Sequence, residues 1–102
     1  MSFFDMFKKG PGFDEGLEQF HNTPDAVLLD VRTKEEYAQG HVPDSINVPL
    51  DRIQTIQVAK DRPLFVYCLS GARSSQACGW LNKKGYQTTN IGGISGYRGP
   101  LK

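Results

Sequence analysis

The chain has 102 residues, of which 38% are hydrophobic and 23% are charged, and its formal net charge at neutral pH is +1. This length suits one globular domain and excludes two domains of ordinary size. The charge gives no broad basic or acidic field, so we expect no binding to nucleic acid.

The first residues, MSFFDMFKKG, contain large apolar side chains interrupted by Asp5 and two lysines. They lack the apolar region of a signal peptide, and no stretch of the chain is apolar enough to span a membrane. We therefore expect a cytoplasmic protein whose thiols stay reduced. Residues 1–11 form an N-terminal segment in this interpretation, and residues 12–102 form the domain. Phe3 and Phe7 either pack on that domain or provide a small apolar anchor.

Four short apolar runs predict strands at residues 26–31, 45–50, 63–68 and 86–91. The first run, AVLLDV, shows no alternation, which is typical of a strand covered on both faces of a parallel sheet. The others are bounded by proline or are rich in β-branched and aromatic residues.

Helical patterns separate these strands. Thr33 and Glu36 form the S/T-x-x-E pattern of a capping box, which opens a short helix that Gly40 ends. Three further helical patterns cover residues 13–20, 50–56 and 72–84. This alternation predicts an α/β fold with a mostly parallel central sheet of four to five strands and helices on both faces. Ligands bind such folds beyond the carboxyl ends of the strands.

The segment YCLSGARSS, residues 67–75, stands at such an end, between a strand and the longest predicted helix. A thiolate is the nucleophilic form of cysteine, and its pKa falls near backbone N–H groups, a helix N-terminus or an arginine. We expect the loop amides to curl around the Cys68 sulfur as an anion-binding nest, which a positive φ at Gly71 permits. Cys68 is therefore the candidate nucleophile. The candidate substrate-binding residues are Leu69, Ser70, Gly71, Ala72, Arg73 and Ser74.

The side chains of this loop have different expected roles. Arg73 falls in the first turn of the helix and would add a fixed positive charge to the nest. The hydroxyl groups of Ser70 and Ser74 can donate hydrogen bonds to a bound anion, although Ser74 is equally suited to capping or packing the helix.

The second cysteine, Cys78, falls on the apolar face of the same helix, and we expect it to be a small core residue. Neither His21 nor His41 stands at a usual metal-ligand spacing from the cysteines. We therefore expect no metal site and no cofactor.

Three segments occur together in the chain: LLDVRTKEEYAQGHVPDSINVPL at 28–50, VYCLSGARS at 66–74 and GYQTTNIGGISGY at 85–97. The first fits D-V-R-x-x-x-E-[FY]-x-x-G-H-[IV]-P, and the second fits C-x-x-G-x-R-S. In this order and spacing they resemble a single-domain rhodanese. The resemblance implies a rhodanese-like domain with sulfurtransferase activity. In that family the cysteine takes a sulfane sulfur from a donor such as thiosulfate, holds it as a persulfide and passes it to cyanide or a thiol.

The same resemblance makes Cys68 the persulfide carrier and Leu69 to Arg73 its cradle. The chain departs from the family pattern at Asp44, where glycine is usual, and at Tyr97, where tryptophan often stands. Leu69 is also unusual, because thiosulfate-processing loops often carry further basic or polar residues. We therefore expect a small sulfur-containing anion or a persulfide as partner, with a protein sulfur carrier as an alternative donor whose approach involves Leu69.

The first motif supplies four candidate supporting residues, Asp30, Arg32, Glu36 and His41. Asp30 can accept hydrogen bonds that brace the loop after its strand, and Arg32 can pair with Asp30 or with Glu36. His41 follows a glycine at a turn. We expect all four to form a structural network.

Two other functions remain open. A cysteine phosphatase or arsenate reductase uses a similar cradle, but such phosphatases have C-x5-R, whereas four residues separate Cys68 from Arg73 here. Tyr67 also replaces the histidine that precedes their cysteine, and the loop has no general-acid aspartate. The other alternative is a rhodanese-like interaction module without turnover, which has no need of a reactive cysteine.

Overall fold

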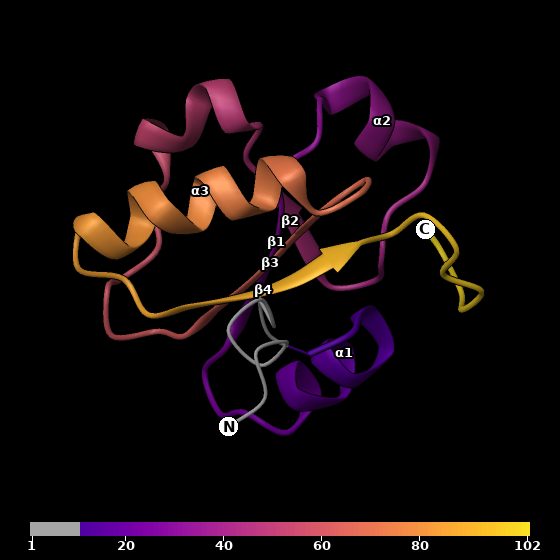
Figure 1. Cartoon of the computed structure of the whole chain (residues 1–102), viewed down its shortest axis with the longest axis horizontal. Helices are drawn as coiled ribbons and strands as arrows, with labels where there is room; N and C mark the ends of the chain where they lie inside the picture. Colours follow the sequence, from indigo (N-terminus) through magenta and orange to yellow (C-terminus); the bar gives the residue numbers. More distant parts are fainter. Residues whose placement is uncertain (1–10) are drawn as a thin grey trace, which may run out of the picture.

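A computed structural model of the chain describes residues 11–102, so Phe3, Phe7 and most of the proposed segment 1–11 lie outside the described residues. Figure 1 shows the arrangement of the elements. In chain order they are α1 (Phe13–His21), β1 (Val27–Asp30), α2 (Lys34–Gln39), β2 (Ser45–Asn47), the 3-10 helix η2 (Leu50–Thr55), β3 (Leu64–Cys68), α3 (Ala72–Lys83) and β4 (Thr88–Gly93).

The four strands of the described region form one sheet in the order β2-β1-β3-β4, and all three pairings are parallel. The predicted α/β fold is confirmed. The last strand begins later than predicted and includes Gly92 and Gly93. Tyr86 precedes the strand: its N–H donates to Leu81 O of α3 at 3.1 Å, so this amide does not pair with β3.

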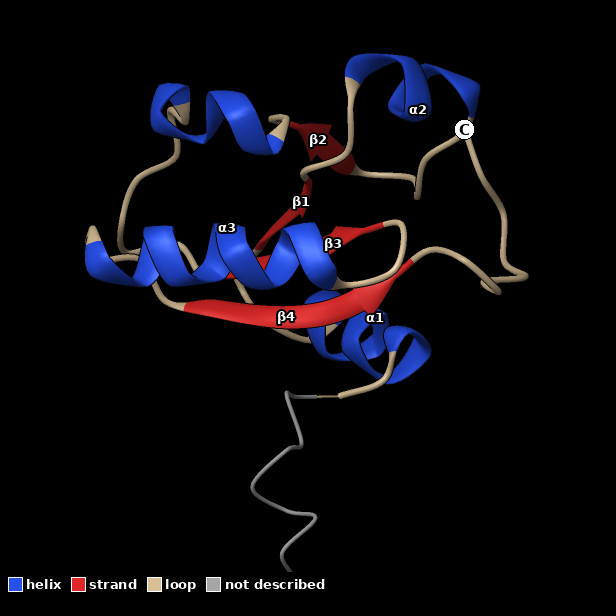
Figure 2. Cartoon of the chain, turned by 45° about the horizontal axis from the view of Figure 1, so that its top comes forward, coloured by secondary structure: helices blue, strands red, loops and turns tan. Residues whose placement is uncertain are grey.

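Helices cover both faces of the sheet, as expected: α3 and η2 lie on one side and α1 on the other (Figure 2). Successive residues of a strand point to opposite faces. Leu29 and Val66 accordingly pack with Leu81 of α3, whereas Phe65 packs with Leu17 of α1. No helix within residues 11–102 is long and apolar enough to cross a membrane.

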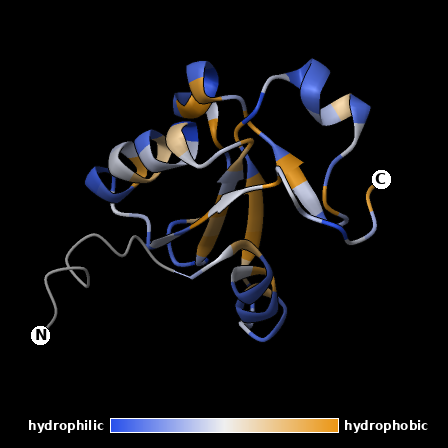
Figure 3. Cartoon of the chain, turned by 45° about the vertical axis from the view of Figure 1, so that its right-hand side comes forward, coloured by the Kyte–Doolittle hydropathy of each residue, from blue (hydrophilic) through white to orange (hydrophobic). Residues whose placement is uncertain are grey.

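The apolar colouring of Figure 3 is strongest on strands at the centre of the sheet, whereas the helix ribbons are mostly blue or pale. Every residue of β1 and of β3 is buried. Burial on both faces explains why these two strands are apolar throughout except for Asp30 at the end of β1. Burial of apolar surface contributes about 25 cal/mol for each Å² removed from water, so these two strands provide the centre of the core.

The short helix α2 begins with the predicted capping box, which is confirmed. Thr33 Oγ1 accepts a hydrogen bond from the Glu36 N–H at 3.1 Å, and Glu36 Oε1 accepts one from the Thr33 N–H at 2.9 Å. These bonds satisfy amide groups that a helix start leaves without partners. The helix lies toward the carboxyl ends of the strands (Figure 1), so the box places the Glu36 carboxylate at that edge of the sheet.

Candidate active site

Cys68 is the last residue of β3, and a three-residue loop connects it to α3. Gly71 ends that loop with φ of 105°, a left-handed conformation that favours glycine. The turn directs two backbone amides at the sulfur: the Gly71 N–H donates to Cys68 Sγ at 3.0 Å and the Ser74 N–H at 3.3 Å. We call residues 68–74 the cradle.

The cradle changes the acidity of the thiol. Burial of Cys68 raises its pKa, because the charged thiolate loses contact with water. Hydrogen bonds from the Ser74 side chain and from the amides of Ser74, Gly71 and Ser70 act in the opposite direction. The hydrogen bonds prevail, and the pKa of Cys68 lies below its ordinary value. A larger fraction of the sulfur is therefore nucleophilic thiolate near neutral pH.

Residues at the end of β4 and directly after it hold the cradle in place. The Ile94 N–H donates to Cys68 O at 2.9 Å and the Ser95 N–H to Leu69 O at 3.0 Å. Gly93 lies so close to the loop that a Cβ atom there would collide with the carbonyl oxygen of Leu69. The position of the loop therefore depends on β4, the strand that follows α3 in the chain.

Two hollows flank the loop between Cys68 and α3. One, of about 530 Å³, is lined in part by Ser70, Gly71 and Asn90. The other, of about 380 Å³, is lined in part by Leu69 and Glu36. Cys68 has no exposed surface, whereas Leu69, which follows it, is 44% exposed. A reactant can therefore reach the loop from either side, but the sulfur itself lies beneath the loop.

Asn90 of β4 is a cradle contact that our reading of the sequence missed. Its Oδ1 atom accepts a hydrogen bond from the Ser74 hydroxyl at 2.7 Å, and that hydroxyl oxygen lies 3.5 Å from Cys68 Sγ. The parallel register pairs Asn90 with Val66, which places it on the α3 face of the sheet. A polar residue within a predicted strand was a signal in the sequence that could have indicated Asn90. The register between β3 and β4, which decides what Asn90 contacts, was not evident from the sequence.

Arg73 forms an ion pair with Glu36 of α2. Its guanidinium donates to Glu36 Oε1 at 2.7 Å and to Oε2 at 3.0 Å, a bidentate pair, and no hydrogen bond joins it to the sulfur. Glu36 raises the pKa of Arg73, and the negative Cys68 contributes in the same direction. Arg73 therefore lies at the edge of the cradle with its orientation set by Glu36.

This pair makes stability depend on pH. Arg73 holds the pKa of Glu36 at about 2, below its ordinary value of 4.5. Because the pKa is depressed in the folded state, the stabilisation is complete above the ordinary pKa and is lost as the pH falls toward 2. We expect Glu36→Gln to lower the free energy of unfolding near neutral pH by about 1 kcal/mol, a value that allows for partial exposure to solvent.

Urea unfolding at about pH 7 and about pH 3 measures this effect. The difference between parent and Glu36→Gln is expected to shrink at the lower pH. Glu35→Gln is the matched control, because it removes a charge from the same helical turn without an Arg73 contact. An equal difference at both pH values would contradict the prediction.

Asp30 and Arg32 form a buried ion pair beneath the site. Arg32 Nη2 donates to Asp30 Oδ2 at 2.7 Å, Arg32 N donates to Asp30 Oδ1 at 2.8 Å, and Nη2 also reaches Gly40 O at 2.7 Å. Of the two partners that the sequence left open for Arg32, it pairs with Asp30. The pair connects the end of β1 to the residue that follows α2.

His41 lies in the loop after α2. Its ring stacks on that of Tyr37, with centroids 3.6 Å apart, and Nδ1 lies 2.9 Å from Tyr37 O. Its backbone N–H donates to Lys102 O, and its carbonyl accepts from the Lys102 N–H. None of these contacts involves Cys68.

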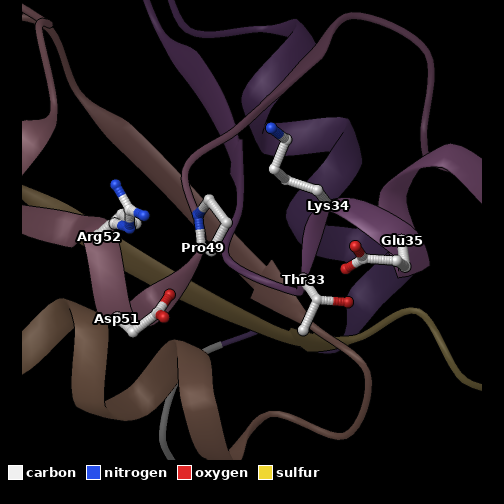
Figure 4. Close-up of a pocket in the computed structure, with 6 residues that line it drawn as sticks. All are labelled: Thr33, Lys34, Glu35, Pro49, Asp51 and Arg52. Carbon is white, nitrogen blue, oxygen red and sulfur yellow. The ribbon is translucent and has the colours of Figure 1, made fainter.

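Figure 4 shows a separate pocket of about 300 Å³ between the start of α2 and η2. Its lining residues are Thr33, Lys34, Glu35, Pro49, Asp51 and Arg52. Acidic and basic side chains share its rim, and it has no nucleophilic cysteine. Within residues 11–102, no three His, Cys, Asp or Glu side chains lie close enough together to hold a metal ion. The cradle is therefore the best candidate for covalent chemistry.

Comparisons with known proteins identify the family to which this chain is related. The sequence model of the rhodanese-like domain family matches residues 14–99. A sulfurtransferase of Allochromatium vinosum is 44% identical over 75 residues, which cover 71% of this chain and 70% of that protein. YtwF of Bacillus subtilis, provisionally named a sulfurtransferase, is 30% identical over 90 residues and is matched over 83% of this chain and 85% of its own length.

A solved structure agrees with the fold. The rhodanese-like domain protein from Staphylococcus aureus superposes with a TM-score of 0.80 and 26% identity, covering 93% of this chain and 97% of that one. The resemblance to a single-domain rhodanese is thus confirmed by the family match, by relatives and by structure. The chain belongs to the rhodanese-like domain family.

Proposed function

We propose that the protein is a sulfurtransferase that carries a sulfane sulfur on Cys68. The family membership and the relatives named as sulfurtransferases support sulfurtransferase activity in general. The observation that carries the specific proposal is the convergence of the Gly71 and Ser74 amides on Cys68 Sγ. An amide-bound thiolate is suited to attack on sulfur and to departure from sulfur.

The proposed reaction has two steps. In the first, the Cys68 thiolate attacks the outer sulfur of thiosulfate, the S–S bond of the donor breaks, and sulfite leaves with the bonding electron pair. The product is a Cys68 persulfide anion. In the second step, cyanide or a thiolate attacks the outer sulfur, and thiocyanate or a new persulfide leaves while the Cys68 thiolate is restored. Backbone amides stabilise the anions in both steps without a general base.

The surroundings of the cradle favour a persulfide donor over thiosulfate. The guanidinium of Arg73 is bound to Glu36, and that of Arg32 is bound to Asp30, so both charges are compensated. The exposed Leu69 side chain adds an apolar surface beside the loop. A low-molecular-weight persulfide or a protein sulfur carrier suits such a surface better than a small dianion does. A cytoplasmic location, where thiols stay reduced, suits a carrier whose two cysteines are free.

Intact mass spectrometry of the reduced protein tests this function. After incubation with thiosulfate or with glutathione persulfide, we expect a gain of one sulfur atom, located on Cys68 by peptide mapping and removed by cyanide. We expect faster loading from glutathione persulfide. Failure of both donors to add sulfur, with Cys68 still open to alkylation, would contradict the proposal. A Cys68 that resists alkylation would favour a module without turnover.

A further inference from the structure

The Ser74 hydroxyl has more acceptors around it than it has hydrogens. Its oxygen lies 2.7 Å from Asn90 Oδ1, 3.0 Å from Gly71 O and 3.5 Å from Cys68 Sγ. A hydroxyl group donates one hydrogen bond. Since the shortest of these contacts is to Asn90, the Ser74 proton points to Asn90, and the Ser74 oxygen can then accept the S–H of a protonated Cys68.

The orientation of the Asn90 amide is determined by its neighbours. The Gly92 N–H can only donate, and it donates to Asn90 Oδ1 at 2.9 Å. A β-bulge supports this contact: Val66 pairs with Asn90, but Tyr67 pairs with Gly92, so Ile91 is an extra residue in β4. Bulges next to active sites often redirect a side chain or a backbone group. An inverted amide would place two donors together, so Asn90 presents oxygen to Ser74.

We propose that Asn90 is a positioning residue that competes with the Cys68 sulfur for the one hydroxyl proton of Ser74. When Cys68 is a thiol, its S–H satisfies the Ser74 oxygen, and Ser74 donates to Asn90. When Cys68 is a thiolate, Ser74 can donate to the sulfur only by leaving Asn90 Oδ1, the nearest acceptor, and by not turning to Gly71 O at 3.0 Å. The contribution of the Ser74 hydroxyl to the thiolate is therefore smaller than the geometry around the sulfur alone would allow, whereas the backbone amides face no such competition.

The charged groups around Cys68 act on it electrostatically and do not compete for the Ser74 proton. Arg73 and Cys78 of α3 interact electrostatically with Cys68, and Arg73 is in turn paired with Glu36 of α2. Asp30 of β1 acts on Arg73 and is neutralised by Arg32. The strand β4 itself has no titratable side chain, so Asn90 acts through hydrogen bonding alone.

The test is a cycle of thiol pKa values for the parent, Asn90→Leu, Ser74→Ala and the double variant. The pKa is measured by thiolate absorbance and by the pH dependence of alkylation. Leucine has a similar size but accepts no hydrogen bond. We expect Asn90→Leu to lower the Cys68 pKa by about one unit, because a hydrogen bond to a charged acceptor is gained. Ser74→Ala is expected to raise the pKa more in the Asn90→Leu protein than in the parent.

Two further variants separate competition from simple support of the loop. Asn90→Asp keeps the acceptor and adds a negative charge, so it is expected to raise the pKa. Thr89→Val is the matched control on β4, because Thr89 pairs with Phe65 of the opposite face, and it is expected to leave the pKa unchanged. A higher pKa in Asn90→Leu, or an equal effect of Ser74→Ala in both backgrounds, would overturn the proposal.

A second readout rests on the proposed sulfurtransferase function. At a pH above both thiol pKa values, Asn90→Leu is expected to take up sulfur about threefold more slowly, because nucleophilicity falls with pKa. Its persulfide is expected to discharge to cyanide faster, because Cys68 is then a better leaving group. The thiol pKa requires no sulfur donor, so failure of sulfur transfer and failure of the Asn90 proposal give different results.

Discussion

Replacement of Cys68 by alanine is expected to abolish sulfur uptake and transfer. The variant lacks the atom that forms the persulfide, and no other group in the cradle is a nucleophile of comparable strength. The Gly71 and Ser74 amides lose their sulfur acceptor in this variant, which lowers stability by about 1–3 kcal/mol if water does not replace it. Rates of thiocyanate formation and intact mass after incubation with donor measure the loss.

Cys78→Ala is the matched control for this experiment. Cys78 is a residue of α3 that lies in the hydrophobic core, and burial raises the pKa of its thiol. We expect Cys78→Ala to retain sulfur transfer, with at most a small loss of stability from the missing sulfur atom. Cys68→Ser keeps a hydrogen-bond acceptor for the amides. It therefore tests the role of the sulfur even if Cys68→Ala does not fold. Transfer that survives in both Cys68 variants would contradict the persulfide mechanism.

The largest expected effect on stability comes from Asp30→Ala. Asp30 has no exposed surface and Arg32 is 5% exposed, so the variant leaves a guanidinium buried without its carboxylate. The loss of one partner from a buried ion pair lowers the free energy of unfolding by about 3–5 kcal/mol. Contacts of Arg32 with Gly40 O and with the Tyr67 ring, whose centroid is 5.7 Å away, retain the side chain near its place. Unfolding in urea measures the change.

A double-mutant cycle shows whether pairing is the cause. Asp30→Ala combined with Arg32→Met removes both charges and is expected to destabilise the protein much less than the sum of the single variants. If Asp30→Ala alone fails to fold, a folded double variant identifies the unpaired Arg32 charge as the cause. Additive losses in the cycle, or a loss below about 1 kcal/mol for Asp30→Ala, would contradict a structural role of the pair.

The sequence predicted the parts of this protein that depend on local chemistry. The buried strands β1 and β3 were visible as apolar runs, and the start of α2 was visible in the spacing of Thr33 and Glu36. The loop after Cys68 was recognisable because a strand, a glycine and a helix occur in that order. These features involve residues close together in the chain, where spacing and geometry are directly related.

The contacts that could not be predicted from the sequence join segments that are far apart in the chain. Arg73 and Glu36 meet because α2 and the first turn of α3 both lie at the carboxyl edge of the sheet, and either side chain had other plausible partners. Asn90 reaches Ser74 because of the register between β3 and β4. Register depends on the packing of both faces and on the bulge, neither of which a single strand sequence encodes.

The all-parallel sheet also has a consequence for folding kinetics. Among the strands of residues 11–102, no two form a hairpin, since each pairing joins strands that a helix separates in the chain. Such non-local contacts form slowly during folding. The carbonyls of Cys68 and Leu69 receive their hydrogen bonds from Ile94 and Ser95, directly after β4. A folding intermediate without β4 therefore lacks the hydrogen bonds that hold the Cys68 loop, and the cradle is complete only when the last strand docks.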